Sequence, residues 1–175
     1  MGRMFRPSLA SSLMLAACSW LAATYASADG FSGLPMATHI VVEKSERRMT
    51  LYENERVLHT YRVALGVEPV GAKQVEGDQR TPEGRYRIVA RNPRSDYFLS
   101  LQVSYPDTRD LERARRAGVK PGGAIMIHGL PNQLRQSPEY YSKTDWTDGC
   151  IALSNADMME VWMLVPENTP IEIRP

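Results

Sequence analysis

Two cysteines occur in the 175-residue sequence, and one of them, Cys150, has neighbours that suggest chemistry. It lies in the stretch Asp148-Gly149-Cys150-Ile151. The other, Cys18, lies in an apolar N-terminal stretch with the pattern of an export signal. Exported proteins usually oxidise their cysteines in pairs, and Cys150 has no partner once that stretch is removed. We therefore expect that any role of Cys150 depends on the reactivity of its thiol.

A cysteine thiol needs a base or a positive field to become a nucleophile, and the chain outside the signal has three candidate histidines. Two of them lie on predicted strands, where a histidine alone is weak evidence of function: His39 and His59. His128 ends an apolar strand and precedes Gly129, which lets another backbone or a substrate come close. The spacing fits a pairing of His128 with Cys150, and it fits equally a buried, inert thiol near an unrelated histidine.

The residues next to Cys150 suggest two kinds of site. Gly149 permits a tight backbone approach and frees neighbouring N–H groups to face a developing oxyanion. Alternatively, Cys150, His128 and Asp148 would supply three ligands to a zinc ion. Zinc sites usually carry closely spaced ligand pairs such as CxxC or HxxxH, which this sequence lacks. We therefore expect no metal cofactor at Cys150, while the spacing alone leaves open whether its thiol is reactive.

The N-terminal segment has the pattern of a secretory signal. Arg3 and Arg6 precede an apolar run over residues 9–26, and Ala26-Ser27-Ala28 offers a cleavage site. The run is short for a membrane span and contains several hydroxyl residues. We expect residues 1–28 to be a signal peptide.

A lipid anchor is the alternative to simple cleavage. Leu15-Ala16-Ala17-Cys18 resembles the bacterial lipobox, in which the cysteine is lipidated, although the apolar run continues past Cys18. Both routes predict export, to the periplasm or the cell envelope.

The chain that follows the signal is nearly neutral. The signal holds two of the 21 basic residues and none of the 20 acidic ones, so 19 basic residues face 20 acidic residues. This balance gives no electrostatic reason to expect binding to nucleic acid or to an acidic membrane. The arginine-rich segment Arg113, Arg115 and Arg116 is expected to be a solvated helix face. The length suits one domain with a single core.

The pattern of apolar residues predicts a mainly β domain over residues 38–174, after a short leader at 29–37. Strands are expected at 38–44, 49–52, 57–65, 85–90, 98–105, 124–128 and 169–173. Helices are expected at 107–117, and from Ser154 or Asn155 to Val165. The second helix should bury Met158, Val161, Trp162 and Val165. Together these elements predict a mixed β-sandwich with two helices packed on it.

Residues 129–146 show no clear period and are expected to form a long surface loop. The loop contains Tyr140, Tyr141 and Trp146. These rings would either form a lid over an extended substrate or anchor the loop in the core, because aromatic side chains do both.

At this point two separated motifs resemble a known family, the L,D-transpeptidases with a YkuD-like domain. His128-Gly129, a spacer and Thr147-Asp148-Gly149-Cys150-Ile151 resemble its catalytic signature. The upstream run over residues 77–86 resembles its Gly-Asp-x-x-Thr-Pro-Glu-Gly segment. The resemblance covers about residues 38–174. Asp148 stands where most members have histidine, and Ala152 where most have arginine, which puts in doubt how the substrate is oriented.

The resemblance implies a mechanism on peptidoglycan stem peptides. His128 takes the thiol proton, and Cys150 attacks the carbonyl of the third residue of a tetrapeptide stem, a diaminopimelate. The terminal D-alanine leaves and a thioester remains. The carbonyl of Gly129 is expected to orient His128. Substrate or oxyanion contacts are expected from Trp146, Thr147, Asp148 and Gly149. Carbapenem-type inhibitors are expected to acylate Cys150.

Three functions stay open at the level of sequence. In a transpeptidase, an amine from a second stem or from a wall-anchored protein accepts the acyl group. In a thiol hydrolase of the same fold, water accepts it, which gives a carboxypeptidase or an endopeptidase of cross-links. The third possibility is a wall-binding module without catalysis.

Overall fold

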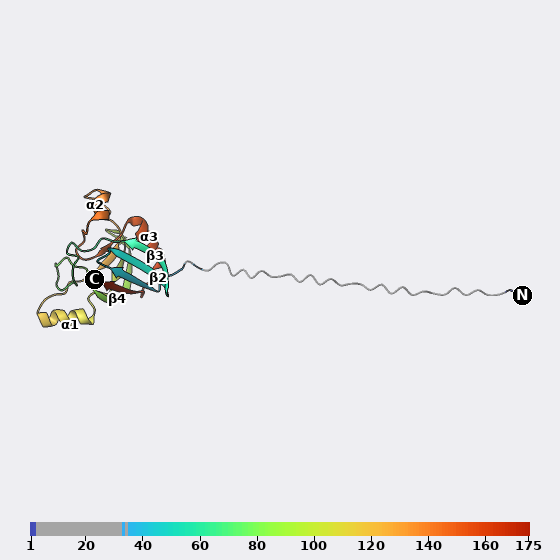
Figure 1. Ribbon diagram of the computed structural model, residues 1–175, viewed down its shortest axis with the longest axis horizontal. Helices are drawn as coiled ribbons and strands as arrows, with labels where there is room; N and C mark the ends of the chain where they lie inside the picture. The colour runs from blue at the N-terminus through green and yellow to red at the C-terminus, as the bar shows by residue number, and fades with distance from the viewer. Residues whose placement is uncertain (3–32, 34) are drawn as a thin grey trace. The chain divides into compact units, whose positions relative to one another are not determined.

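The computed structural model describes residues 1–2, 33 and 35–175 (Figure 1). The predicted signal peptide at 1–28, apart from its first two residues, lies outside the described part of the chain, and so does Cys18. Among the helices that are described, none combines the length and hydropathy that a membrane span requires. The account below concerns the unit from Gly33 to Pro175.

Eight strands form one mixed sheet in the order β3-β2-β1-β8-β4-β5-β6-β7. Their bounds are β1 His39–Glu43, β2 Arg48–Glu53, β3 Arg56–Arg62, β4 Gly84–Ser95, β5 Phe98–Val103, β6 Met126–His128, β7 Ile151–Ala152 and β8 Pro170–Arg174. Two neighbouring pairs are parallel, β1 with β8 and β6 with β7, and the remaining pairs are antiparallel. The predicted mixed, mainly β fold is confirmed.

The long strand β4 joins the two halves of the sheet. Its first residues, 84–87, pair with β8, and its later residues pair with β5. A register shift between Ile88 and Ala90 lies close to this change of partner. Irregularities of this kind bend a strand and let it turn the corner between two layers. The two layers of the predicted sandwich are therefore two halves of one curled sheet.

The curl brings the two ends of the sheet together. The N–H groups of Ala64 and Ala152 each donate to the other residue's carbonyl, at 2.9 and 2.8 Å. This antiparallel bridge continues the chain beyond β3 and joins it to β7, the last strand of the order. The predicted strand 57–65 is thus shorter than expected. It ends as β3 at Arg62, and the residues after it pair with β7 instead of β2.

The core lies inside the curl and contains side chains from both halves of the sheet and from the last helix. Fully buried members include Ile40, Met49, Leu51, Ile88, Leu101, Ile127, Ile151, Met158 and Val161. Each such side chain stabilises the fold by about 1.5–3 kcal/mol relative to exposure. Trp162 is only partly buried, and the guanidinium of Arg91 lies over its ring, 4.1 Å from the centroid. The other three predicted core residues of this helix are buried.

Three helices occur in the described residues, at Thr108–Ala117 (α1), Pro138–Lys143 (α2) and Asn155–Leu164 (α3). α1 starts with a capping box and ends at Gly118, whose φ of 67° is left-handed. α3 starts at the predicted cap Ser154.

The prediction of a structureless loop at 129–146 was wrong, because α2 lies within it. α2 has only six residues, so it is too short to show a hydrophobic period. Its local signals are Ser137, whose side chain caps the helix, and Pro138 at its start.

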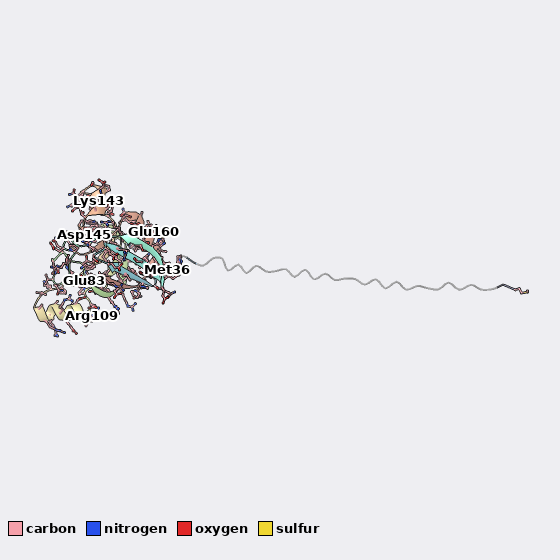
Figure 2. All side chains as sticks on the ribbon, viewed as in Figure 1. Met36, Glu83, Arg109, Lys143, Asp145 and Glu160 are labelled. Carbon is pink, nitrogen blue, oxygen red and sulfur yellow. The ribbon has the colours of Figure 1, made fainter. Side chains whose placement is uncertain are left out.

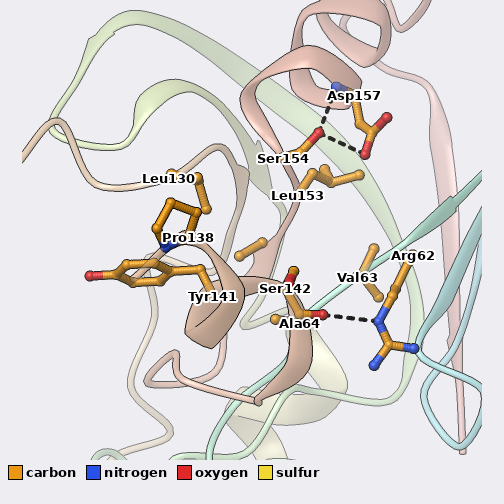
Figure 3. A pocket seen from close by; sticks show the side chains of 11 residues that line it. Arg62, Val63, Ala64, Leu130, Pro138, Tyr141, Ser142, Leu153, Ser154 and Asp157 are labelled. Carbon is orange, nitrogen blue, oxygen red and sulfur yellow. Dashed lines mark hydrogen bonds between the residues drawn. The ribbon is translucent and has the colours of Figure 1, made fainter. Parts of the chain in front are cut away.

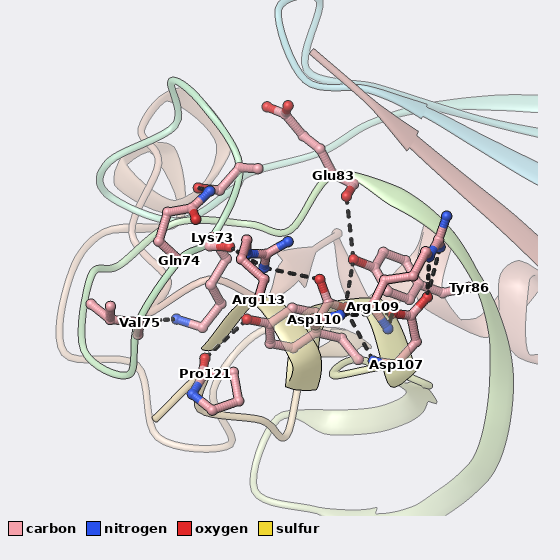
Figure 4. A network of polar contacts seen from close by, with 12 residues as sticks. Lys73, Gln74, Val75, Glu83, Tyr86, Asp107, Arg109, Asp110, Arg113 and Pro121 are labelled. Carbon is pink, nitrogen blue, oxygen red and sulfur yellow. Dashed lines mark hydrogen bonds and ion pairs between the residues drawn. The ribbon is translucent and has the colours of Figure 1, made fainter. Parts of the chain in front are cut away.

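A network of polar contacts ties α1 to the loop that precedes β4 (Figure 4). Asp110 is buried and accepts hydrogen bonds from the Tyr86 hydroxyl at 3.1 Å and from the Asp107 N–H at 3.0 Å. Arg113 forms an ion pair with Asp110 at 2.9 Å and donates to the Lys73 carbonyl at 3.0 Å. The expected solvated face therefore holds for Arg115 and Arg116 only, because Arg113 is turned toward the loop.

Candidate active site

His128 and Cys150 line the same pocket, which has a volume of about 230 Å³. β6 and β7 run parallel with His128 opposite Ala152. Side chains alternate along a strand, so Cys150, two residues before Ala152, faces the same side of the sheet as His128. The pocket is lined by Ser95, Tyr97, Ser100, Ala124, Met126, His128, Trp146, Thr147, Asp148 and Cys150.

The Cys150 sulfur is part-buried and contacts two backbone groups. The Met126 N–H donates to Sγ at 3.4 Å, and the thiol donates to the Ala124 carbonyl at 3.7 Å. Within the described chain these are its hydrogen-bond partners, and the His128 imidazole is not among them. The sequence-predicted pair therefore shares a pocket without a direct hydrogen bond between the two side chains.

His128 is held in one tautomer. Its side chain is buried, and Nδ1 lies 2.7 Å from the carbonyl oxygen of Gly129. Because a carbonyl can only accept, Nδ1 carries the proton and the lone pair is on Nε2. Burial lowers the pKa of His128, although the hydrogen bond to Gly129 opposes this. The imidazole is therefore neutral at physiological pH and can accept a proton at Nε2.

The Cys150 thiol is also neutral at rest. Burial raises the pKa of Cys150, and the charge of Asp148 raises it further, whereas the Met126 N–H and the Lys73 charge lower it. If both the thiol and the imidazole are neutral, the resting site contains no preformed thiolate–imidazolium pair. The neutral pair can react only if the proton moves as the sulfur attacks.

Thr147 shapes the turn before the cysteine. Its hydroxyl donates to the Cys150 carbonyl at 2.8 Å and accepts from the Gly149 N–H at 3.2 Å. The Gly149 N–H is thus occupied and does not face a developing oxyanion. The N–H of Cys150 itself has no acceptor in the described part of the chain. Sequence reasoning missed this group, since no residue pattern shows which N–H a turn leaves free.

Gly149 is required by the backbone and by a close contact. Its φ is 121°, a conformation that side chains rarely permit. A Cβ atom at this position would lie 2.6 Å from the carbonyl oxygen of Arg80. The loop that carries Arg80 therefore fixes the backbone immediately before Cys150.

The upstream motif holds that loop in place. The Asp78 carboxylate pairs with Lys73 at 2.7 Å and accepts from the N–H groups of Gln74, Val75 and Arg80. The Thr81 hydroxyl accepts from the Gly66 N–H at 3.1 Å. Glu83 pairs with Lys44, a buried lysine, at 2.7 Å. The motif thus acts as a structural brace for this loop.

Asp145, which is labelled in Figure 2, fixes the segment that precedes Cys150 in the chain. Its carboxylate accepts from the Leu65 N–H at 2.9 Å and pairs with Arg47 at 2.8 Å. Trp146 follows directly and lies beside the imidazole, with ring centroids 5.6 Å apart. The Tyr97 ring also lies beside the imidazole, with centroids 4.6 Å apart, and its centroid is 6.1 Å from that of Trp146.

The three loop aromatics have different surroundings. Tyr141 is buried and packs edge-on against Trp146 at 5.0 Å, so it anchors the loop. Trp146 forms part of the pocket wall. Tyr140 is 40% exposed and contacts Tyr141 at 5.4 Å. Only Tyr140 has the exposure that the lid hypothesis needs.

The remaining candidates lie at the edge of the pocket or away from it. Asp148 lines the pocket, is exposed, and accepts a long hydrogen bond of 3.5 Å from the Gln79 amide. His39 stacks on Tyr52, and His59 lies 3.6 Å from Glu160, so neither lines the pocket. In the described chain no three His, Cys, Asp or Glu side chains form a group that could hold a metal ion.

Ala152 lies at a second hollow beside the site (Figure 3). This hollow has a volume of about 250 Å³ and a mostly apolar wall. Leu130, Tyr141 and Leu153 contribute apolar side chains to it, and Arg62 lies at its edge, where its Nε donates to the Ser142 carbonyl at 3.1 Å. The side chain of Ala152 is a single methyl group and leaves space open in this hollow.

Comparisons with known proteins concern the family and the fold of the chain. A profile of the L,D-transpeptidase catalytic domain family (YkuD) matches residues 37–173. The chain is 29% identical over 133 residues to the putative L,D-transpeptidase YafK of Escherichia coli K12, which covers 73% of this chain and 46% of that protein. It is 28% identical over 141 residues to the putative L,D-transpeptidase YkuD of Bacillus licheniformis, a match that covers 78% of this chain and 65% of that protein. The chain spans about half the length of the first of these relatives.

Solved structures show the same fold. The helical cell shape determining protein Pgp2 of Campylobacter jejuni is 26% identical, with a TM-score of 0.57, over 77% of this chain and 46% of that one. The L,D-transpeptidase LdtMt1, solved in complex with imipenem, has a TM-score of 0.50 and 18% identity, over 77% of this chain and 57% of that one. At that identity the second likeness concerns the fold alone.

Proposed function

The chain belongs to the L,D-transpeptidase catalytic domain family, and from this premise we propose that it is a cysteine acyltransferase of peptidoglycan stem peptides. Cys150 is the nucleophile, and His128 is the general base. The observation that carries the proposal is the shared pocket, in which a neutral thiol faces the same space as an imidazole whose Nε2 is free to accept a proton.

The first half-reaction makes a thioester. As the sulfur attacks the carbonyl carbon of the third stem residue, its proton passes to His128 Nε2. The N–H of Cys150 donates to the oxyanion that forms. When this intermediate collapses, the C–N bond to the terminal D-alanine breaks, and the imidazolium returns the proton to the leaving amine.

The second half-reaction transfers the acyl group. An amine of a second stem, or of a wall-anchored protein, attacks the thioester and loses a proton to His128. The C–S bond then breaks, and Cys150 regains a proton from the imidazolium. The proposal includes export to the periplasm or cell envelope, where the polymer is found, and acylation of Cys150 by carbapenems.

Hydrolysis is the second candidate function, in which water replaces the amine. It is favoured by Ala152, whose methyl group cannot bind a substrate carboxylate or an acceptor, and by the open hollow beside it (Figure 3). Because Ala152 itself carries no guanidinium, this position offers one fewer group to orient an acceptor amine against competition from water.

Purified tetrapeptide muropeptides distinguish the candidates. A cross-linked dimer supports transfer, a tripeptide supports carboxypeptidase activity, and cleavage of isolated dimers supports endopeptidase activity. We expect Cys150→Ala to abolish every product and His128→Gln to reduce turnover by about 10²–10⁴-fold. If cells that carry Cys150→Ala have the same wall composition as wild-type cells, the protein would instead be a non-catalytic binding module.

The pH profile of that assay tests the role of His128. Burial lowers the pKa of His128 below its ordinary 6.5, so most of the imidazole is still neutral at pH 6.5. We therefore expect kcat/KM to fall on the acid side only at a pH below 6.5. The profile is measured with the wild type and with His128→Gln, which should lose this acid limb. An acid limb above pH 7 would contradict the assignment.

A further inference from the structure

A larger hollow adjoins the thiol pocket on its aromatic side. It has a volume of about 760 Å³, within the range of ligand sites. We call it the aromatic hollow, and its lining residues are Asp96, Tyr97, Pro131, Asn132, Gln133, Arg135, Gln136, Tyr140, Tyr141 and Trp146. Tyr97 and Trp146 also line the thiol pocket, so a ligand that reaches from one hollow to the other passes along these two rings.

Two exposed rings lie in the aromatic hollow. Tyr97, between β4 and β5, and Tyr140, on α2, are each 40% exposed. Among the residues described, neither hydroxyl has a hydrogen-bond partner. A tyrosine with an open ring and an open hydroxyl offers an apolar surface and a polar tip to one ligand.

The polar side chains of the hollow are uncommitted as well, except for Asn132, whose amide bonds to the backbone of Phe98 and Ser95. Gln133, Gln136 and Asp96 make no side-chain hydrogen bond to a described residue, and Arg135 is bonded through its backbone N–H only. One carboxylate and one guanidinium give the hollow no net charge, which does not suit a phosphate-bearing polymer or lipid. Amide groups both donate and accept, which suits hydroxyl and acetamido groups.

The indole of Trp146 adds an independent observation. Its Nε1 atom is buried and has no acceptor in the described chain. Buried polar groups are nearly always hydrogen-bonded, so this indole N–H lacks the partner that such groups usually have.

From these features we propose that the aromatic hollow binds the glycan of peptidoglycan, at the N-acetylated hexosamine that carries the stem peptide. Open aromatic faces fit the C–H face of a pyranose ring, and the amides fit its hydroxyl and acetamido groups. This inference rests on the proposed function for the identity of the polymer, and adds to it a second contact that is distant from the scissile bond.

The spacing of the two hollows is compatible with one substrate. The sugar is separated from the reacting carbonyl by the first two residues of the stem and part of the third, about 10 Å of extended chain. The Tyr97 ring lies 4.6 Å from the His128 ring, and Tyr140 lies farther away, beyond Tyr141 and Trp146. A stem of this length can therefore connect a sugar in the hollow to the thiol pocket.

Binding of the peptide-free disaccharide of N-acetylglucosamine and N-acetylmuramic acid to the full chain tests the inference directly. We expect calorimetry to detect binding, and expect Tyr140→Ala and Gln136→Ala to weaken it by about fivefold or more. The matched control is Gln74→Ala, an exposed glutamine outside the hollow. Thermal melting of each variant verifies that it folds.

Kinetics provide the second readout. Tyr140→Ala should lower kcat/KM for the disaccharide-tetrapeptide and leave kcat/KM for the free tetrapeptide unchanged. If the chain turns over both substrates equally and does not bind the disaccharide, the inference is overturned while the proposed function stands. If it binds the disaccharide through Tyr140 but turns over neither substrate, the sugar site stands and the proposed function fails.

Discussion

The Nδ1 atom of His128 lies 2.7 Å from the carbonyl oxygen of the next residue, Gly129. This contact between neighbours fixes the tautomer and points the free nitrogen, Nε2, away from the backbone. Gly129 also allows Asn155 to approach: a Cβ atom there would lie 2.5 Å from the Asn155 Oδ1, which accepts from the Leu130 N–H at 2.8 Å. The His128 imidazole is thus oriented by the backbone carbonyl of Gly129 rather than by a carboxylate.

Alkylation of Cys150 should remain slow at neutral pH. Iodoacetamide reacts with thiolates, and burial raises the pKa of Cys150 above its ordinary 9.0. We therefore expect the rate of modification, followed by mass spectrometry of the Cys150 peptide, to keep increasing above pH 9. Glutathione under the same conditions is the control and should level off earlier. A plateau below pH 8 would mean that the resting site contains a thiolate–imidazolium pair, contrary to our account.

Substitution Asp148→Asn should make the thiol more reactive. The carboxylate charge is one of the causes that raise the pKa of Cys150, so its removal lowers that pKa. We expect alkylation at pH 8 to be faster by roughly two- to fivefold. Glu76→Gln is the matched control, because Glu76 is an exposed carboxylate that does not line the thiol pocket. Equal rates in Asp148→Asn and the wild type would refute this effect of Asp148.

Substitution Gly149→Ala should damage both stability and activity. The new methyl group would combine a strained φ of 121° with a contact of 2.6 Å to the Arg80 carbonyl. Gly118→Ala is the control, because Gly118 has a φ of 67° and no heavy atom within 4 Å of the added Cβ. We expect denaturant unfolding to give a loss of about 1–2 kcal/mol for Gly118→Ala and a clearly larger loss for Gly149→Ala. Equal losses would show that the Arg80 contact is not tight.

Asp78 should make the fold sensitive to acid. Burial alone would raise the pKa of Asp78, but the Lys73 ion pair and three N–H donors lower it to about 2. A carboxylate with a lowered folded pKa contributes stability above its unfolded pKa of about 3.9, and this is lost as the pH falls through 2.

Since solvent screens part of the Asp78 contacts, we expect Asp78→Asn to cost roughly 1 kcal/mol at pH 7 and little near pH 2. Denaturant unfolding at both pH values measures the difference, with Glu112→Gln on the exposed face of α1 as the control. A cost that is the same at both pH values would contradict the assignment.

Much of this protein is determined by local sequence. Alternating apolar residues predicted most of the strands, and Gly118 and Ser154 predicted the end of one helix and the start of another, because caps and periods are properties of adjacent residues. The motif around His128 and Cys150, together with the upstream run over residues 77–86, indicated the family that the profile match confirms.

Tertiary structure decided what depends on residues far apart in the chain. Pairing with β6 creates β7, a strand of two residues that no period could indicate, and the bridge to Ala64 joins it to the other end of the sheet. The same curl sets Arg80 against Gly149, and thereby selects which N–H beside Cys150 stays free. It also brings Tyr97 and Tyr140 to one hollow. The local sequence pattern indicates which face of a strand or helix is apolar. Which residues contact that face depends on how the sheet closes.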